Sequence, residues 1–88
     1  MPLSPIRVLA VDDEADICTL TKRFLEMSEA LEVDAVCSVR EAMAELAKKR
    51  YDVIVSDYQM PDDDGIQFLK SLRAADDRTP FILFTGKG

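Results

Sequence analysis

Hydrophobic residues gather in four short runs along the chain, separated by longer segments of mixed character. Residues 6–11, 52–57 and 80–85 are apolar at nearly every central position, and polar residues follow directly. Such runs are typical of strands that are buried on both faces. Residues 31–35 instead alternate apolar with charged side chains, which predicts a half-exposed strand at an edge of the sheet.

Three segments between these runs carry apolar residues at spacings of three and four, which predicts amphipathic helices. They span residues 15–28, residues 38–49 and the stretch that begins at Gly65. Ser38 and Glu41 match a capping box at the start of the second helix. We expect the helices to pack on the sheet through Ile17, Leu20, Phe24, Leu25 and Met27, through Ala42, Met43 and Leu46, and through Ile66, Phe68, Leu69 and Leu72.

Strands that alternate with helices predict parallel pairing through right-handed crossovers, and therefore a doubly wound α/β sheet. The 88 residues suit one domain with one modest core. In such sheets, ligands bind beyond the carboxyl ends of the strands. We therefore expect the functional residues to follow directly after the strands.

Charge and composition exclude several classes of function. The chain has 17 acidic and 11 basic residues, a net charge of −6 and no histidine, which opposes direct nucleic-acid binding and excludes a Cys/His zinc site. Cys18 and Cys37 lack a C-x-x-C spacing and are expected to be small buried side chains. The longest apolar runs span four residues, so no membrane span is expected, and without a signal-like amino terminus the expected compartment is the cytoplasm.

Acidic residues follow two of the predicted buried strands. Asp12 and Asp13 end the first, Asp57 ends the third and Thr85 ends the fourth. In a parallel sheet all four would lie at one edge, where each close carboxylate pair repels by about 4 kcal/mol at an effective dielectric near 20. A hard divalent cation such as Mg2+ offsets this repulsion, and Asp57 could then attack phosphorus as a nucleophile.

These residues, taken together, resemble the receiver domain of a two-component response regulator. The resemblance rests on the acidic pair after the first strand, the aspartate ending the third, the Met60-Pro61 turn, Gly65, and Thr85 ending the fourth strand. It implies a flavodoxin-like doubly wound parallel sheet with strand order 2-1-3-4. It also implies a signalling module that changes its own phosphorylation state, in place of an enzyme acting on other substrates.

The resemblance further implies a phosphoacceptor and a metal site. Asp57 would accept a phosphoryl group from a phosphohistidine on a partner sensor histidine kinase or phosphotransfer protein. Mg2+, with Mn2+ or Ca2+ as substitutes, would be ligated directly by Asp13 and Asp57, by Asp12 through water, and by the backbone carbonyl of Gln59.

Four residues near these strand ends would act on the phosphoryl group. Thr85 would hydrogen-bond a phosphoryl oxygen as the switch residue, and the amide of Gly86 would assist it. Gln59 and Lys87 hold the two variable positions that tune the lifetime of the phosphate in this family.

The family pattern continues beyond the features found here. A fourth helix, a fifth strand with its lysine and a fifth helix have no counterpart in the 88 residues, so we expect residues 1–88 to be a carboxyl-terminally incomplete receiver. The fourth strand and the first helix would then expose apolar faces, through which copies of the chain could associate.

Two other functions remain open from the sequence. The first is an interaction module that works without phosphorylation, which is favoured by the lack of the family lysine. The second is a Mg2+-dependent phosphohydrolase, although Asp57 is followed by Tyr58-Gln59 and not by the Asp-x-Asp pattern of aspartyl-phosphate phosphatases.

Overall fold

Four parallel strands form one sheet in the order β2-β1-β3-β4. The computed structural model describes residues 5–57 and 65–84. The strands are β1 (Ile6–Val11), β2 (Leu31–Val36), β3 (Val53–Asp57) and β4 (Phe81–Phe84). The predicted doubly wound sheet and its strand order are confirmed, and β2 lies at an edge as its alternating pattern indicates.

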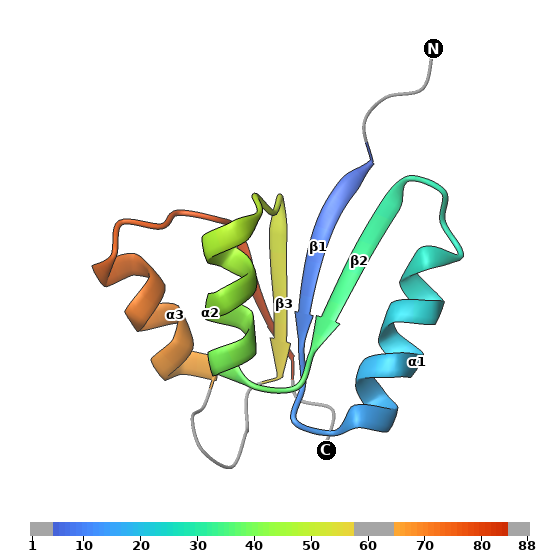
Figure 1. Ribbon diagram of the computed structural model, residues 1–88, viewed down its shortest axis with the longest axis horizontal. Coiled ribbons are helices and arrows are strands. Elements are labelled where there is room, and N and C mark those ends of the chain that lie inside the picture. Colours follow the sequence, from blue (N-terminus) through green and yellow to red (C-terminus); the bar gives the residue numbers. More distant parts are fainter. Residues whose placement is uncertain (1–4, 58–64, 85–88) are drawn as a thin grey trace.

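Three helices cover the two faces of the sheet. α1 (Ala15–Glu26) lies on one face, whereas α2 (Val39–Lys48) and α3 (Gly65–Ala74) lie on the other (Figure 1). Each helix connects two parallel strands, so the chain winds in both directions from the central β1. This arrangement brings the carboxyl ends of all four strands to one edge of the sheet.

The larger part of the core lies between the sheet and the pair α2 and α3. Leu9 of β1, Ile54 of β3 and Phe68 of α3 are fully buried there. The ring of Phe68 packs edge-to-face on that of Phe81, with centroids 5.3 Å apart and planes at 74°. The predicted core positions Ala42 and Leu72 are buried, and Leu46 packs against the same cluster.

The smaller part of the core lies under α1, and here the predicted packing stripe is wrong. Val8, Ala10 and Val33 are buried, and of the predicted stripe Leu25 packs on them. Phe24 and Met27 are instead 72% and 80% exposed, and Ile17 and Leu20 are also exposed. The helix turns Cys18 toward the sheet, and Cys18 and Lys22 form hydrogen bonds to backbone carbonyls on that side.

The outer edge of β2 is bound by two side chains of α1. Nζ of Lys22 donates to the carbonyl oxygen of Val33 at 2.6 Å, and the amide of Val33 donates to Oε2 of Glu26 at 3.1 Å. Lys22 also donates to Oε2 of Glu26 at 2.9 Å, and this hydrogen bond is the chief cause that lowers the pKa of Glu26. The contacts occupy one amide and one carbonyl group that an edge strand would otherwise leave unpaired.

Two further apolar side chains are exposed: Met43, which was predicted to pack in the core, and Ile82, which lies on the strand that was expected to expose an apolar face. Met43 of α2 is partly exposed and Ile82 of β4 is 53% exposed. Ile82 pairs with Val55, which belongs to the face of the sheet that α1 covers. Because α1 packs against β1 and β2, it leaves that face of β4 uncovered.

The predicted capping box at the start of α2 is present, but the side chain of Glu41 bonds to the residue before the cap and not to the cap itself. The hydroxyl of Ser38 accepts from the amide of Glu41 at 3.1 Å, as predicted. Oε1 of Glu41 accepts from the amide of Cys37 at 2.8 Å, one residue before the cap. Cys37 itself is exposed, so the expectation that both cysteines are buried is correct only for Cys18.

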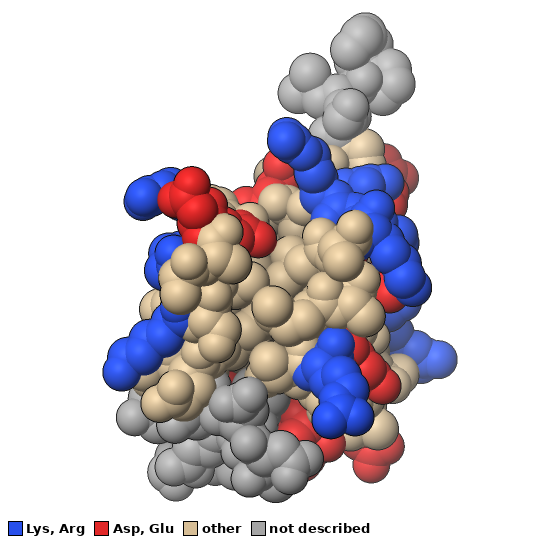
Figure 2. All heavy atoms as spheres, turned by 60° about the vertical axis from the view of Figure 1, so that its left-hand side comes forward, with Lys and Arg blue, Asp and Glu red and all other residues tan. Residues whose placement is uncertain are grey.

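The surface seen from the side of α3 is largely uncharged at its centre. Basic and acidic side chains lie around its margins (Figure 2). Across the described part of the chain, none of the helices combines the length and the hydropathy needed to span a membrane.

Candidate metal centre

Three carboxylates lie at the carboxyl edge of the sheet, where the strand order reverses. β1 and β3 are parallel neighbours, and Val11 lies opposite Ser56. The residues that follow these two, Asp12 and Asp57, therefore lie side by side at the edge of the sheet. Asp12 and Asp13 follow β1, and Asp57 is the last residue of β3. The amide of Asp12 donates to the carbonyl of Val36 at 3.1 Å, which extends the ladder and fixes the backbone of the acidic pair.

Each of the three aspartates offers one oxygen to a compact cluster. These ligand atoms all lie within 4.8 Å of one another. Asp12 is 5% exposed and Asp57 is 3% exposed, while Asp13 is half-buried. The three acidic residues therefore lie together, as predicted, and two of them are almost completely buried.

The electrostatics of the cluster disfavour its fully ionised form. Burial raises the pKa of Asp12, and the charges of Asp57 and Asp13 act in the same direction. The amide of Glu14 donates to Oδ1 of Asp12 at 3.0 Å and opposes the rise. Gathering three carboxylates therefore costs free energy that a bound cation would recover.

The donor set fits a hard divalent cation. Oδ1 of Asp13 is buried and accepts no hydrogen bond from the residues that the structure describes, although buried polar atoms are normally paired. Carboxylate oxygens are the ligands that Mg2+ prefers, usually one or two of them completed by water and phosphate oxygens. An unpaired oxygen beside two further acidic oxygens is the arrangement that such an ion would complete.

Several predicted site residues lie outside the described residues. These are Gln59, Thr85, Gly86 and Lys87, together with the Met60-Pro61 turn. Their predicted roles stay predictions. Gly65, the last member of the pattern before β4, is buried at the first position of α3.

Two residues that the sequence analysis did not assign to the site support its backbone. The thiol of Cys18 donates to the carbonyl oxygen of Asp12 at 3.0 Å, and burial raises the pKa of this thiol to about 12, so it remains a donor. The hydroxyl of Ser56, fully buried, donates to the carbonyl oxygen of Asp57 at 3.1 Å. The sequence indicates the contact of Ser56 only by placing a serine within an otherwise apolar strand.

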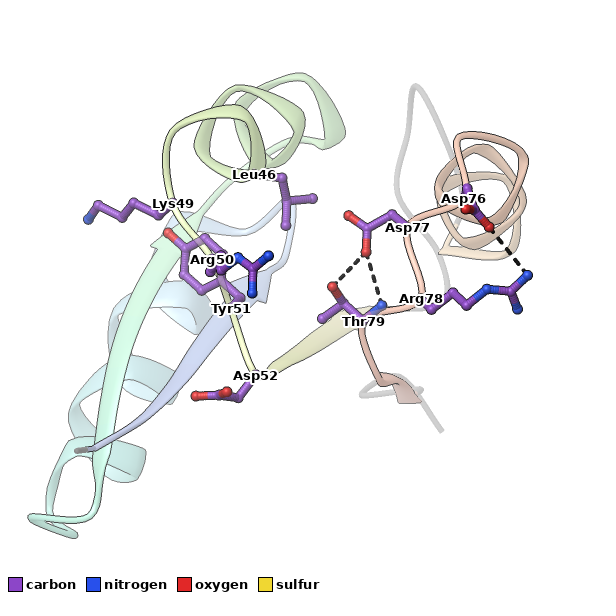
Figure 3. Close-up of a pocket in the computed structure, with 9 residues that line it drawn as sticks. All are labelled: Leu46, Lys49, Arg50, Tyr51, Asp52, Asp76, Asp77, Arg78 and Thr79. Atoms are coloured by element: carbon purple, nitrogen blue, oxygen red, sulfur yellow. Dashed lines mark hydrogen bonds and ion pairs between the residues drawn. The ribbon is translucent and has the colours of Figure 1, made fainter. Parts of the chain in front are cut away.

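A separate hollow of about 350 Å3 lies at the opposite end of the sheet, where β3 and β4 begin (Figure 3). Part of its polar wall is paired internally: Asp77 accepts from the amide and hydroxyl of Thr79, and Asp76 forms an ion pair with Arg78. The length of β3 separates this hollow from the carboxylate cluster, so it is no part of the metal centre.

Comparison with known proteins identifies the family. The response regulator receiver domain family matches residues 8–88. Transcriptional regulatory protein TrcR of Mycobacterium tuberculosis is 39% identical over 84 residues, which is 96% of this chain and 32% of that protein. The chain therefore belongs to the response regulator receiver domains, and it spans about a third of the length of this regulator.

Solved structures agree with the fold. Chemotaxis protein CheY4 of Vibrio cholerae superposes with a TM-score of 0.83 at 35% identity, covering 91% of this chain and 68% of that one. A chain in the complex of histidine kinase ThkA with response regulator TrrA gives a TM-score of 0.82 at 30% identity, covering 94% of this chain and 71% of that one. The family is a signalling family of two-component systems.

Proposed function

We propose that this receiver accepts a phosphoryl group on Asp57 from a phosphohistidine of a partner kinase or phosphotransfer protein. The observation that carries the proposal is the cluster of Asp12, Asp13 and Asp57 within 4.8 Å at the carboxyl edge of the sheet. The receiver family supports it, as does the similarity to a chain in a complex of a histidine kinase with a response regulator.

The transfer exchanges one bond to phosphorus for another. A carboxylate oxygen of Asp57 attacks the phosphorus, the new O–P bond forms, and the P–N bond to the imidazole breaks. The imidazole leaves with the electron pair of that bond and takes up a proton from solvent. Attack of water on the resulting acyl phosphate later returns Asp57 to its carboxylate, so the domain modifies and resets only itself.

Mg2+ would be held by Asp13 and Asp57, with Asp12 contributing through water and Gln59 through its backbone carbonyl. When bound, the ion offsets negative charge on the transferring group. The buried, unpaired Oδ1 of Asp13 supports this assignment. Asp12, held by the amide of Glu14, keeps one oxygen oriented before any ion arrives.

The remaining assignments come from the family pattern. Thr85 would hydrogen-bond the phosphoryl group with help from the amide of Gly86, while Gln59 and Lys87 would tune how long the acyl phosphate survives. A phosphorylated Asp57 carries about two negative charges, which would draw Thr85 toward it and change a distant binding surface.

The test is phosphorylation by the small donor acetyl phosphate in the presence of Mg2+, read by intact mass. We expect the chain to gain one phosphoryl group that hydroxylamine removes, as it does from acyl phosphates. Asp57→Asn should abolish the gain, because an amide is not a nucleophile toward phosphorus. Asp16→Asn, which removes an exposed acid of α1 outside the cluster, is the matched control and should be phosphorylated normally.

Two outcomes would contradict the proposal. Labelling that persists in Asp57→Asn would place the modification elsewhere. Equal labelling with and without Mg2+, after chelation of trace metal, would contradict the metal assignment while leaving Asp57 as the acceptor.

A further inference from the structure

Two cysteine thiols face each other between α1 and the end of β2. Sγ of Cys37 lies 3.8 Å from Sγ of Cys18. Cys18 is in the first part of α1 and is buried, whereas Cys37 directly follows β2 and is exposed. They are the only two cysteines of the sequence, so neither has another partner within the chain.

The surroundings assign different roles to the two thiols. The thiol of Cys18 is enclosed by the ends of β1 and β2, and it contacts the carbonyl oxygens of Asp12 at 3.0 Å and Val36 at 3.1 Å. Cys37 lies at the surface, and its amide is tied to Oε1 of Glu41 at 2.8 Å. A solute oxidant therefore meets Cys37 first, and an oxidised Cys37 has Cys18 as its nearest sulfur.

The distance is short enough for a bond to form with small movement. A disulfide needs the sulfur atoms about 2 Å apart, so they must approach by less than the diameter of one atom. Cys37 lies between the end of β2 and Ser38, the cap of α2, where no strand or helix hydrogen bond must break for its side chain to turn. Cys18 is held in place because its amide donates to the carbonyl of Glu14 at 3.0 Å.

We propose that Cys18 and Cys37 form a redox-reactive pair, which oxidants of the hydroperoxide class convert into an intramolecular disulfide. The thiolate sulfur of Cys37 attacks the terminal peroxide oxygen and the O–O bond breaks, so that Cys37 becomes a sulfenic acid. The other peroxide oxygen leaves and takes up a proton, as an alcohol from an organic hydroperoxide or as water from hydrogen peroxide. Sulfur of Cys18 then attacks the sulfur of Cys37. The S–O bond breaks, the hydroxide leaves with the proton of Cys18 as water, and one peroxide has oxidised two thiols.

The disulfide would alter the backbone beside the carboxylate cluster. In the bonded form Sγ of Cys18 has no proton to donate, so the carbonyl oxygens of Asp12 and Val36 lose this contact. The bond would also join the first part of α1 to the end of β2. Oxidation of the exposed Cys37 would thereby remove a hydrogen bond to the backbone of Asp12, the residue that follows β1.

The test treats the folded chain with hydrogen peroxide and counts free thiols with Ellman's reagent, alongside intact mass and peptide mapping. We expect loss of both thiols, a mass lower by two hydrogen atoms, a peptide pair joined through Cys18 and Cys37, and full reversal by dithiothreitol. Cys37→Ser, a conservative change at an exposed position, should keep its Cys18 thiol under the same treatment. Cys18→Ser should instead accumulate oxygen on Cys37.

Other outcomes would overturn the proposal. These are a Cys37 carrying two oxygen atoms beside a free Cys18 in the wild-type chain, dimers joined through Cys37 as the main product, or equal loss of the Cys18 thiol in Cys37→Ser. None of these measurements uses Mg2+ or phosphorylation, so their result is independent of the proposed function.

Discussion

The hydroxyl of Tyr51 donates a hydrogen bond of 2.6 Å to Oδ2 of Asp34. This contact joins Tyr51, two residues before β3, to the middle of the edge strand β2. Nζ of Lys49 reaches the same oxygen at 3.1 Å. The hydrogen bond from Tyr51 is the chief cause that lowers the pKa of Asp34 from its ordinary 3.8.

Replacing Tyr51 with Phe should lower the free energy of unfolding by about 1 kcal/mol at pH 7, since the buried hydroxyl donates to a charged acceptor that is partly exposed. A lowered pKa in the folded state means that stability from Asp34 is present above the unfolded pKa and is lost as the pH falls through the folded pKa. Urea unfolding at pH 7 and at pH 3 should therefore show the two proteins converging at the lower pH. An equal gap at both values would contradict this account.

Asp13→Asn should have opposite effects with and without Mg2+. In metal-free buffer it removes one of three clustered charges and should raise the free energy of unfolding by about 1 kcal/mol. With Mg2+ at a hundred-fold excess over its dissociation constant, the wild-type chain should gain about 2.7 kcal/mol, whereas the variant should gain much less. Thermal unfolding with EDTA and with Mg2+ measures both effects, and Asp16→Asn serves as the charge-matched control. Equal gains in the two proteins would remove Asp13 from the metal site.

Phe68 and Phe24 test the two sides of the sheet. Phe68→Ala empties a fully buried position between α3 and β4 and should cost about 3–5 kcal/mol in free energy of unfolding. Phe24→Ala alters a side chain that is 72% exposed and should change stability by less than about 0.5 kcal/mol. Urea midpoints of the two variants provide the comparison. A large loss in Phe24→Ala would show that this face of α1 is covered in solution.

Glu26→Gln should loosen the outer edge of β2. The carboxylate accepts from both Lys22 and the amide of Val33, and these hydrogen bonds lower its pKa. Its contribution is therefore present above the unfolded pKa and is lost as the pH falls through the folded pKa. Hydrogen exchange at the amide of Val33 should be faster in the variant near neutral pH, with a smaller difference in acid. Glu29→Gln, a nearby exposed change, should leave that amide unaffected.

The strands and the acidic cluster could be predicted because both depend on simple periodicities. An apolar run that ends in aspartate fixes where a buried strand stops, and parallel pairing of β1 with β3 then brings Asp12 beside Asp57. The alternation in β2 also predicted its edge position. These conclusions depend on backbone geometry and burial alone, which one sequence is able to report.

The side of α1 that packs on the sheet could not be predicted in this way. Hydrophobicity favours the stripe with Leu20 and Phe24, whereas the structure turns Cys18 and Leu25 toward the strands. On the side that faces the sheet, Cys18 and Lys22 form hydrogen bonds to strand carbonyls, and a hydrophobicity pattern does not report such contacts. The exposure of Ile82, in contrast, agrees with the expectation that the fourth strand presents an apolar face.

The central place of β1 also affects the order in which the fold can be completed. This strand is synthesised first, yet it pairs with β2 on one side and with β3 on the other. At translation rates of roughly 5–20 residues per second, its second neighbour emerges from the ribosome some seconds later. During that interval residues 8–11 have one flank without a paired strand, and this flank stays open until β3 has left the ribosome.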